Sequence, residues 1–146
     1  MAKKEAATAP VSGSILDLNF DDVYEPELWN DGDEVDMVIK KASVAPSKSG
    51  KNNVITIVLW DPADSRKAPL TERLTIPSAA DHDEDPAKYN NMKLRIQSMV
   101  ECFGVSTNNV NISAEWPGAG GSVIVRLEED EQYGKRNSVK KFVVGH

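Results

Sequence analysis

Basic residues gather in two short turns, and these turns hold the residue types best suited to bind a ligand. Ammonium and guanidinium groups bind phosphate through charge-assisted hydrogen bonds. Exposed lysines are also the normal state of a protein surface, so no single residue here is decisive. The prediction depends on the two turns meeting at one groove, where a polyanion would contact cations at both walls. The five turn residues are Lys48, Lys51, Tyr133, Lys135 and Arg136.

Five strand-like runs and one helix must position these turns. Alternation of apolar and polar residues is typical of half-buried strands, and the run 53–60 (NVITIVLW) has the strongest strand character. The other runs are 34–44, 68–76, 122–128 and 137–144. The last run does not alternate cleanly, so the face occupied by Lys140 stays open. The order of three strands, one helix and two strands is that of a five-stranded OB-fold barrel, which is a mainly β fold.

The predicted helix covers residues 86–104 and lies between strands three and four. Asp85 is suited to the N-cap, Pro86 to the first helical position, and Gly104 to the left-handed residue that ends a helix. Apolar residues recur at helical spacing and form one stripe, which predicts that this face packs on the sheet. The stripe consists of Tyr89, Met92, Ile96, Met99, Val100 and Phe103.

Outward-facing positions of the predicted barrel add a stacking ring and further cations. In an OB-fold the turn after strand one and the turn after strand four flank the ligand groove. Thr56 indicates which face of strand two points outward, and Trp60 shares that face unless it belongs to the core. A cationic track with a stacking aromatic is what sequence-tolerant binding of a single strand needs. The outward candidates are Lys40, Trp60, Arg73 and Arg126.

The net charge of −6 is concentrated before the first strand. Residues 15–34 hold eight acidic residues and no basic one, whereas residues 35–80 hold seven basic and four acidic residues. Residues 1–14 are small and polar, which is typical of a flexible leader. We expect residues 15–34 to form an irregular acidic arm whose apolar side chains lie on the barrel, and residues 35–146 to form the binding domain. The neutral-to-basic barrel is compatible with an anionic ligand.

Sequence motifs for catalysis, cofactors and metals are missing. The acidic run 81–85 does not fit an EF-hand loop, because Pro86 and Met92 stand where Gly and Glu are needed. The single Cys102 excludes an intramolecular disulfide and, with two histidines, a Cys/His zinc site; a buried, inert thiol is expected. No apolar run has the length of a membrane span, and the N-terminus lacks a signal peptide. We therefore expect a cytoplasmic, non-enzymatic protein without a cofactor.

Four stretches carry a resemblance to a known family. They are LDLNFDDV at 16–23, Gly32 together with SKSGKNN at 47–53, the helix ending in CFG, and EDEQYGKRNSVKKF at 129–142. With these stretches the chain resembles phage-encoded OB-fold single-stranded DNA-binding proteins. The resemblance implies a role in phage DNA replication, recombination or repair, in the host cytoplasm. It also implies that six residues lie at the DNA-binding surface: Lys48, Lys51, Tyr133, Arg136, Asn137 and Lys140.

The C-terminus departs from that family. Many proteins of this function end in an acidic, aromatic-tipped tail that recruits partners, whereas this chain ends KKFVVGH and carries its acidic residues near the front. Either the arm takes over contact with replication or recombination proteins, or recruitment is absent or arranged differently. A monomer and a homodimer are both compatible with the sequence.

The sequence thus predicts a protein that binds and protects single-stranded DNA without sequence specificity. The alternative is an OB-type protein-interaction module or inhibitor that binds a basic partner with its acidic arm, and the net charge favours this alternative. A metal-dependent nuclease comes third, because no carboxylate spacing points to one.

Overall fold

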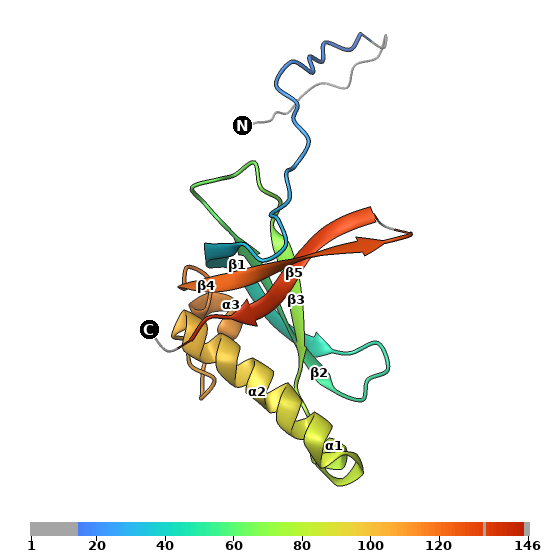
Figure 1. Ribbon diagram of the computed structural model, residues 1–146, viewed down its shortest axis with the longest axis vertical. Coiled ribbons are helices and arrows are strands. Elements are labelled where there is room, and N and C mark those ends of the chain that lie inside the picture. Colours follow the sequence, from blue (N-terminus) through green and yellow to red (C-terminus); the bar gives the residue numbers. More distant parts are fainter. Residues whose placement is uncertain (1–14, 133, 145–146) are drawn as a thin grey trace.

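The computed structural model describes residues 15–132 and 134–144, and its centre is a five-stranded antiparallel sheet. The strands follow one another in the sheet in the order β3-β2-β1-β4-β5 (Figure 1). The predicted mainly β class and all five predicted strands are confirmed, while the predicted leader and Tyr133 lie outside the described residues. The strands are β1 (Glu34–Pro46), β2 (Asn53–Trp60), β3 (Leu70–Thr75), β4 (Gly120–Asp130) and β5 (Gly134–Phe142).

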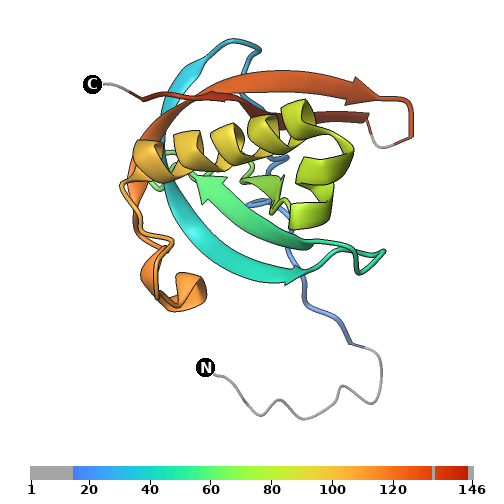
Figure 2. The ribbon, with the colours of Figure 1, turned by 90° about the horizontal axis from the view of Figure 1, so that it is seen from below.

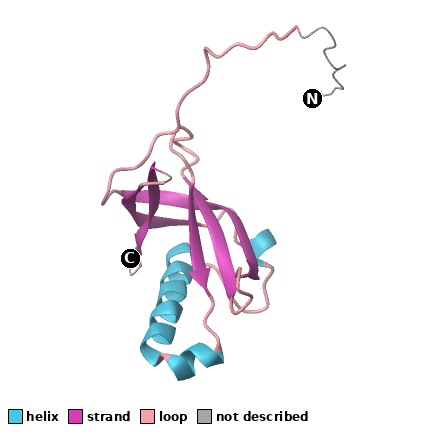
Figure 3. Cartoon of the chain, turned by 90° about the vertical axis from the view of Figure 1, so that its right-hand side faces the viewer, coloured by secondary structure: helices cyan, strands magenta, loops and turns pink. Residues whose placement is uncertain are grey.

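The described part of the chain contains three helices rather than the one predicted: α1 (Ala79–Glu84), α2 (Pro86–Phe103) and α3 (Ile112–Glu115) (Figure 3). The predicted helix is α2. The Asp85 side chain caps it by accepting a hydrogen bond from Lys88 N, and Gly104 ends it at a φ of 64°. None of the helices in the described residues is long and apolar enough to cross a membrane.

Helix α1 was not predicted, although the sequence contains a signal for its start. Ser78 and Asp81 form a capping box, in which each side chain accepts from the other residue's backbone N–H. This reciprocal pair makes residues 79–84 a helix of their own. The Ser-x-x-Asp spacing was the signal that could have revealed it.

The hydrophobic core lies between the concave face of the sheet and α2. Figure 2 shows α2 lying across the opening of the curved sheet, with β1 and β2 on one side and β4 and β5 on the other. Ile55, Ile57 and Leu59 of β2 are buried, as their alternation predicted, and they share one buried cluster with Met99 and Phe103 of α2. The sheet and helix therefore bury their apolar faces against each other.

Two β-bulges shift the inward-facing positions within strands. In β1 the buried residues are Val35, Met37 and Ile39, after which the pairing register with β2 skips Lys40 and the next buried residue is Ala42. In β5 the register with β4 skips Lys140 in the same way. An extra residue on one strand reverses the side-chain phase beyond it. This bulge explains why the β5 sequence does not alternate.

The two edge strands of the sheet, β3 and β5, are joined by side chains. Glu72 of β3 accepts a hydrogen bond from Val139 N of β5 at 2.6 Å. Arg95 of α2 donates to Val139 O at 2.9 Å and pairs with Glu72 at 3.3 Å. No backbone ladder joins β3 to β5 in the described residues, so the sheet is open in its backbone pairing. We call the contact made by Glu72, Arg95 and Val139 the seam.

The predicted contact between the arm and the barrel is wrong for most of the arm. Six of its apolar side chains are exposed to solvent, and of these Tyr24 has the Arg66 guanidinium 4.9 Å from its ring centroid. The Glu27–Lys67 bridge is the point where the arm first pairs with the sheet region, and beyond it Leu28 and Trp29 are partly buried. The exposed side chains are Ile15, Leu16, Leu18, Phe20, Val23 and Tyr24.

Close packing of β4 on the end of α2 yields a first prediction. A Cβ atom at Gly121 would lie 2.6 Å from Cys102 O and 2.8 Å from its Sγ, whereas one at Gly120 would meet nothing nearer than 3.7 Å. Gly121→Ala is therefore expected to lower the free energy of unfolding by about 2 kcal/mol, as overpacking does. Gly120→Ala is the matched control and should change it by less than about 0.5 kcal/mol. Denaturant titration measures both; equal effects would contradict the packing described here.

Candidate functional site

The β1–β2 turn (residues 47–52) and the β4–β5 hairpin project toward the same side of the molecule (Figures 1 and 2). Residues of this turn line one hollow, and residues of β4 and β5 line a second. The turn hollow, of about 480 Å³, is lined by Lys48 and Thr56 among others. The seam hollow, of about 270 Å³, is lined by Arg126 and Arg136 among others. Arg73 lines both. Four of the predicted residues are thus brought together along one tract.

Two further cations were missed by the sequence analysis. Arg95 also lines the seam hollow, and with Lys88 and Arg73 it lines a third hollow of about 290 Å³ between β3 and α2. Arg95 lies three residues after Met92 and four before Met99, within the apolar stripe of α2. A cation at that position has to lie beside the sheet, and this spacing was the available signal.

The seam hollow combines four arginines with two carboxylates. Arg136 Nη2 lies 3.3 Å from Glu128 Oε2, and Arg126 Nη1 lies 3.8 Å from Glu128 Oε1. Glu72 is paired with Arg95 at the seam. Positive charge therefore exceeds negative charge in the hollow, which favours an anionic ligand.

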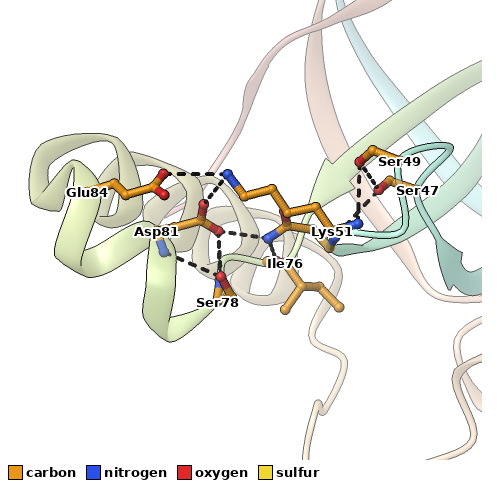
Figure 4. A network of polar contacts seen from close by, with 8 residues as sticks. Ser47, Ser49, Lys51, Ile76, Ser78, Asp81 and Glu84 are labelled. Carbon is orange, nitrogen blue, oxygen red and sulfur yellow. Dashed lines mark hydrogen bonds and ion pairs between the residues drawn. The ribbon is translucent and has the colours of Figure 1, made fainter.

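Lys51 is placed differently from the prediction. Its ammonium pairs with Glu84 at 3.5 Å and with Asp81 at 3.8 Å, both on α1 (Figure 4). Asn52 donates to Asp81 Oδ2 at 2.7 Å and to Ile76 O at 2.9 Å. These contacts join the β1–β2 turn to α1. The Lys51 side chain is still 54% exposed, so its role in ligand binding stays a prediction. Lys48 on the same turn is exposed as well.

The contacts of Asp81 with the β1–β2 turn and Ser78 make the free energy of unfolding depend on pH in the acid range. Hydrogen bonds from the Ser78 backbone and the Asn52 side chain lower the pKa of Asp81 from 3.8 to about 2. A lowered carboxyl pKa contributes stability above pH 3.8, and this contribution disappears as the pH falls from 3.8 toward 2. Carboxyl NMR titration should give a midpoint near 2, and Asn52→Ala should raise that midpoint toward 3.8. An unchanged midpoint in the variant would rule out Asn52 as a cause.

The prediction that Asn137 lies at the binding surface is wrong, because its side chain is buried and makes hydrogen bonds within the protein. The residue is 8% exposed. Its amide accepts from Trp29 N at 2.7 Å and donates to Trp29 O at 3.0 Å and to Arg126 O at 3.4 Å. Asn137 therefore holds the end of the acidic arm against β5 and does not face a ligand.

The remaining predicted residues line neither the turn hollow nor the seam hollow. Trp60 is half-buried on the outward face of β2, with the Lys40 ammonium 4.6 Å from its ring centroid. Lys135 is exposed opposite Glu129, and Lys140 is exposed at the β5 bulge. Trp60 shares its outward face with Thr56 by strand alternation.

The described residues offer no cluster of metal ligands, and the thiol of Cys102 is buried. No cluster of three or more His, Cys, Asp or Glu there is arranged to hold a metal ion. Cys102 is buried as predicted, its Sγ donates to Ser122 O at 3.1 Å, and burial raises its pKa. A thiol of that kind is a poor nucleophile.

Comparison with known proteins does not identify a family. No protein-family model matches this chain, and no curated protein matches its sequence.

Proposed function

We propose that this protein binds single-stranded DNA without sequence preference along the tract from Lys48 through Arg73 to Arg126 and Arg136. The observation that carries the proposal is that Arg73 lines both hollows, so the cations of the two predicted walls belong to one surface. Cations spaced along such a surface neutralise successive phosphates and release counterions. The protein coats the strand and performs no chemistry on it.

The floor of the tract suits the bases. Thr56 and Val58 of β2 pair across the sheet with Arg73 and Thr71 of β3. The side chains of Thr56, Val58 and Thr71 form an outward face of small and apolar groups beside Arg73, and this face continues to Trp60. Bases of any sequence can lie on such a face, because stacking and apolar contact do not depend on base identity.

The fold proposed for this function is an OB-type barrel. Its support is the strand order β3-β2-β1-β4-β5, with α2 between β3 and β4 and the seam between the two edges. In this proposal the Glu72 and Arg95 side chains close the barrel in place of a backbone ladder. The ligand tract then lies where OB-folds bind oligonucleotides.

The resemblance to phage-encoded single-stranded DNA-binding proteins suggests the setting. We propose that the protein protects DNA strands exposed in the host cytoplasm during phage replication, recombination or repair, as a monomer or homodimer. Contact with replication or recombination proteins is assigned to the acidic arm.

Titration of labelled oligo(dT) and of a matched duplex tests this function. We expect binding of oligo(dT) with a site of about 4–16 nucleotides, weaker binding of the duplex, and a steep loss of affinity between about 50 and 200 mM salt. Failure to bind oligo(dT) at low salt would end the proposal.

A second candidate function is favoured by the arm. Residues such as Leu16 and Phe20 are 80% and 68% exposed within an acidic segment. Exposed apolar groups of this kind mark protein interaction sites. In this alternative the protein is an interaction module that binds a basic partner. Binding of poly-lysine without binding of oligo(dT), and its loss in Leu16→Ser/Phe20→Ser, would favour the alternative.

A further inference from the structure

The two carboxylates of the seam hollow are held in different ways. Glu72 accepts from Val139 N at 2.6 Å, and its side chain is 12% exposed. Glu128 contacts the guanidinium groups of Arg126 and Arg136 at 3.8 and 3.3 Å, and its side chain is 33% exposed. Its Oε2 has no hydrogen-bond partner within the described chain, so the nearer contact is an ion pair without hydrogen-bond geometry. Glu72 is therefore fixed in the seam by a hydrogen bond, whereas the contacts of Glu128 within the described chain are two ion pairs.

A hydroxyl group in the same hollow lacks a partner. Ser138 lies opposite Arg126 in the β4–β5 pairing and lines the seam hollow. Its Oγ is buried, and among the described residues it has no hydrogen-bond partner. A buried polar group without a partner is unfavourable and is rare in folded proteins. An oxygen-rich anion in the hollow would supply the missing acceptor.

These two observations describe a site that is filled by an internal anion when no ligand is bound. We propose that the seam hollow is a seat for one phosphate group, which displaces Glu128 from Arg126 and Arg136 and accepts a hydrogen bond from Ser138 Oγ. Arginine is suited to this exchange, because its planar fork binds carboxylate and phosphate in the same manner. Phosphate carries more acceptor oxygens than Glu128 and can reach the arginines and the hydroxyl at once.

The proposal deepens the proposed function and rests on it for the source of the phosphate, which is a nucleotide of the bound strand. Glu128 then acts as a competitor built into the site. It reduces the affinity for any phosphate, and it keeps the two arginines from repelling each other when the hollow is empty.

Glu128→Gln and Ser138→Ala test the seat, with Glu129→Gln as the matched control for the loss of one negative charge on the same strand. Glu129 is exposed and pairs across the sheet with Lys135. For oligo(dT) at fixed salt we expect Glu128→Gln to tighten binding about fivefold and Ser138→Ala to weaken it about tenfold. Glu129→Gln should change it by less than about twofold. Thermal unfolding verifies that each variant is folded.

Titration with pyrophosphate tests the phosphate seat independently of the proposal that the phosphate belongs to a DNA strand. If oligo(dT) binds wild type and all three variants equally, the seat is wrong and the proposed function stands. If oligo(dT) does not bind but pyrophosphate does, and Glu128→Gln tightens it, the seat stands and the proposed function is wrong. If Glu128→Gln and Glu129→Gln tighten binding equally, the gain in affinity comes from the change in net charge, and the proposed phosphate seat is wrong.

Discussion

Lys48→Glu/Arg73→Glu is expected to weaken oligo(dT) binding by at least about 100-fold at low salt and to abolish it near physiological salt. Lys48 is an exposed residue at one end of the turn hollow, and Arg73 lines both hollows. Reversing both charges places carboxylates where two phosphates would lie and divides the tract in the middle. Fluorescence anisotropy with labelled oligo(dT) measures the loss.

The alanine version shows whether the two residues contact phosphates. Each phosphate contact contributes about 0.7 to the slope of log affinity against log salt for a single strand, so Lys48→Ala/Arg73→Ala should lower that slope by about 1.4.

Lys93→Glu/Lys141→Glu is the matched control for the charge reversal. It changes the net charge by the same amount at exposed positions that line neither hollow. An equal loss of affinity in both charge-reversal variants would mean that net charge, rather than the tract, governs binding.

Local sequence signals were sufficient to predict the ends of α2 and the buried face of β2. Asp85, Pro86 and Gly104 mark the ends of α2 by the hydrogen bonds and backbone angles that those residue types favour, and the structure places them there. The alternation of β2 gave its buried face for a similar reason, since strand geometry fixes which residues share a side. Each of these inferences depends on residues a few positions apart.

The contacts of polar side chains with partners distant in the sequence could not be predicted. Lys51 and Asn137 both looked like free polar residues near a binding surface. Lys51 pairs with carboxylates about one-fifth of the chain away, and Asn137 bonds to Trp29, 108 positions earlier. The bulge at Lys140 likewise arises from pairing with β4. Whether a polar side chain is available to a ligand is a tertiary property, and single-sequence patterns do not contain it.

Arg95 is the opposite case, a residue that lines the candidate site but was not predicted to do so. Arg95 was not predicted because it lies on the helix, outside the two turns that flank the ligand groove of an OB-fold. Its guanidinium reaches both the seam and the seam hollow, since α2 crosses the opening of the sheet. The helix therefore contributes to the candidate site as well as to the core.

Glu72→Ala is expected to have the largest effect on stability, lowering the free energy of unfolding by about 3 kcal/mol. The substitution removes the acceptor of Val139 N and the carboxylate partner of Arg95, which are the contacts that join β3 to β5. The Arg95 side chain is 37% exposed, so water can solvate its charge and the loss stays below that of a fully buried ion pair. Glu72→Gln keeps an acceptor oxygen and should lose about 1 kcal/mol.

Hydrogen exchange at the Val139 amide distinguishes a seam from an ordinary surface contact. The amide should exchange much faster in Glu72→Ala than in wild type, and Glu101→Ala on the exposed side of α2 should leave it unchanged. Because Glu72 is negative, its removal would on charge alone strengthen DNA binding. A loss of affinity together with faster exchange would therefore mean that the seam positions Arg73 and Arg95 for the ligand. Slow exchange in Glu72→Ala would instead mean that the edges hold together without this side chain.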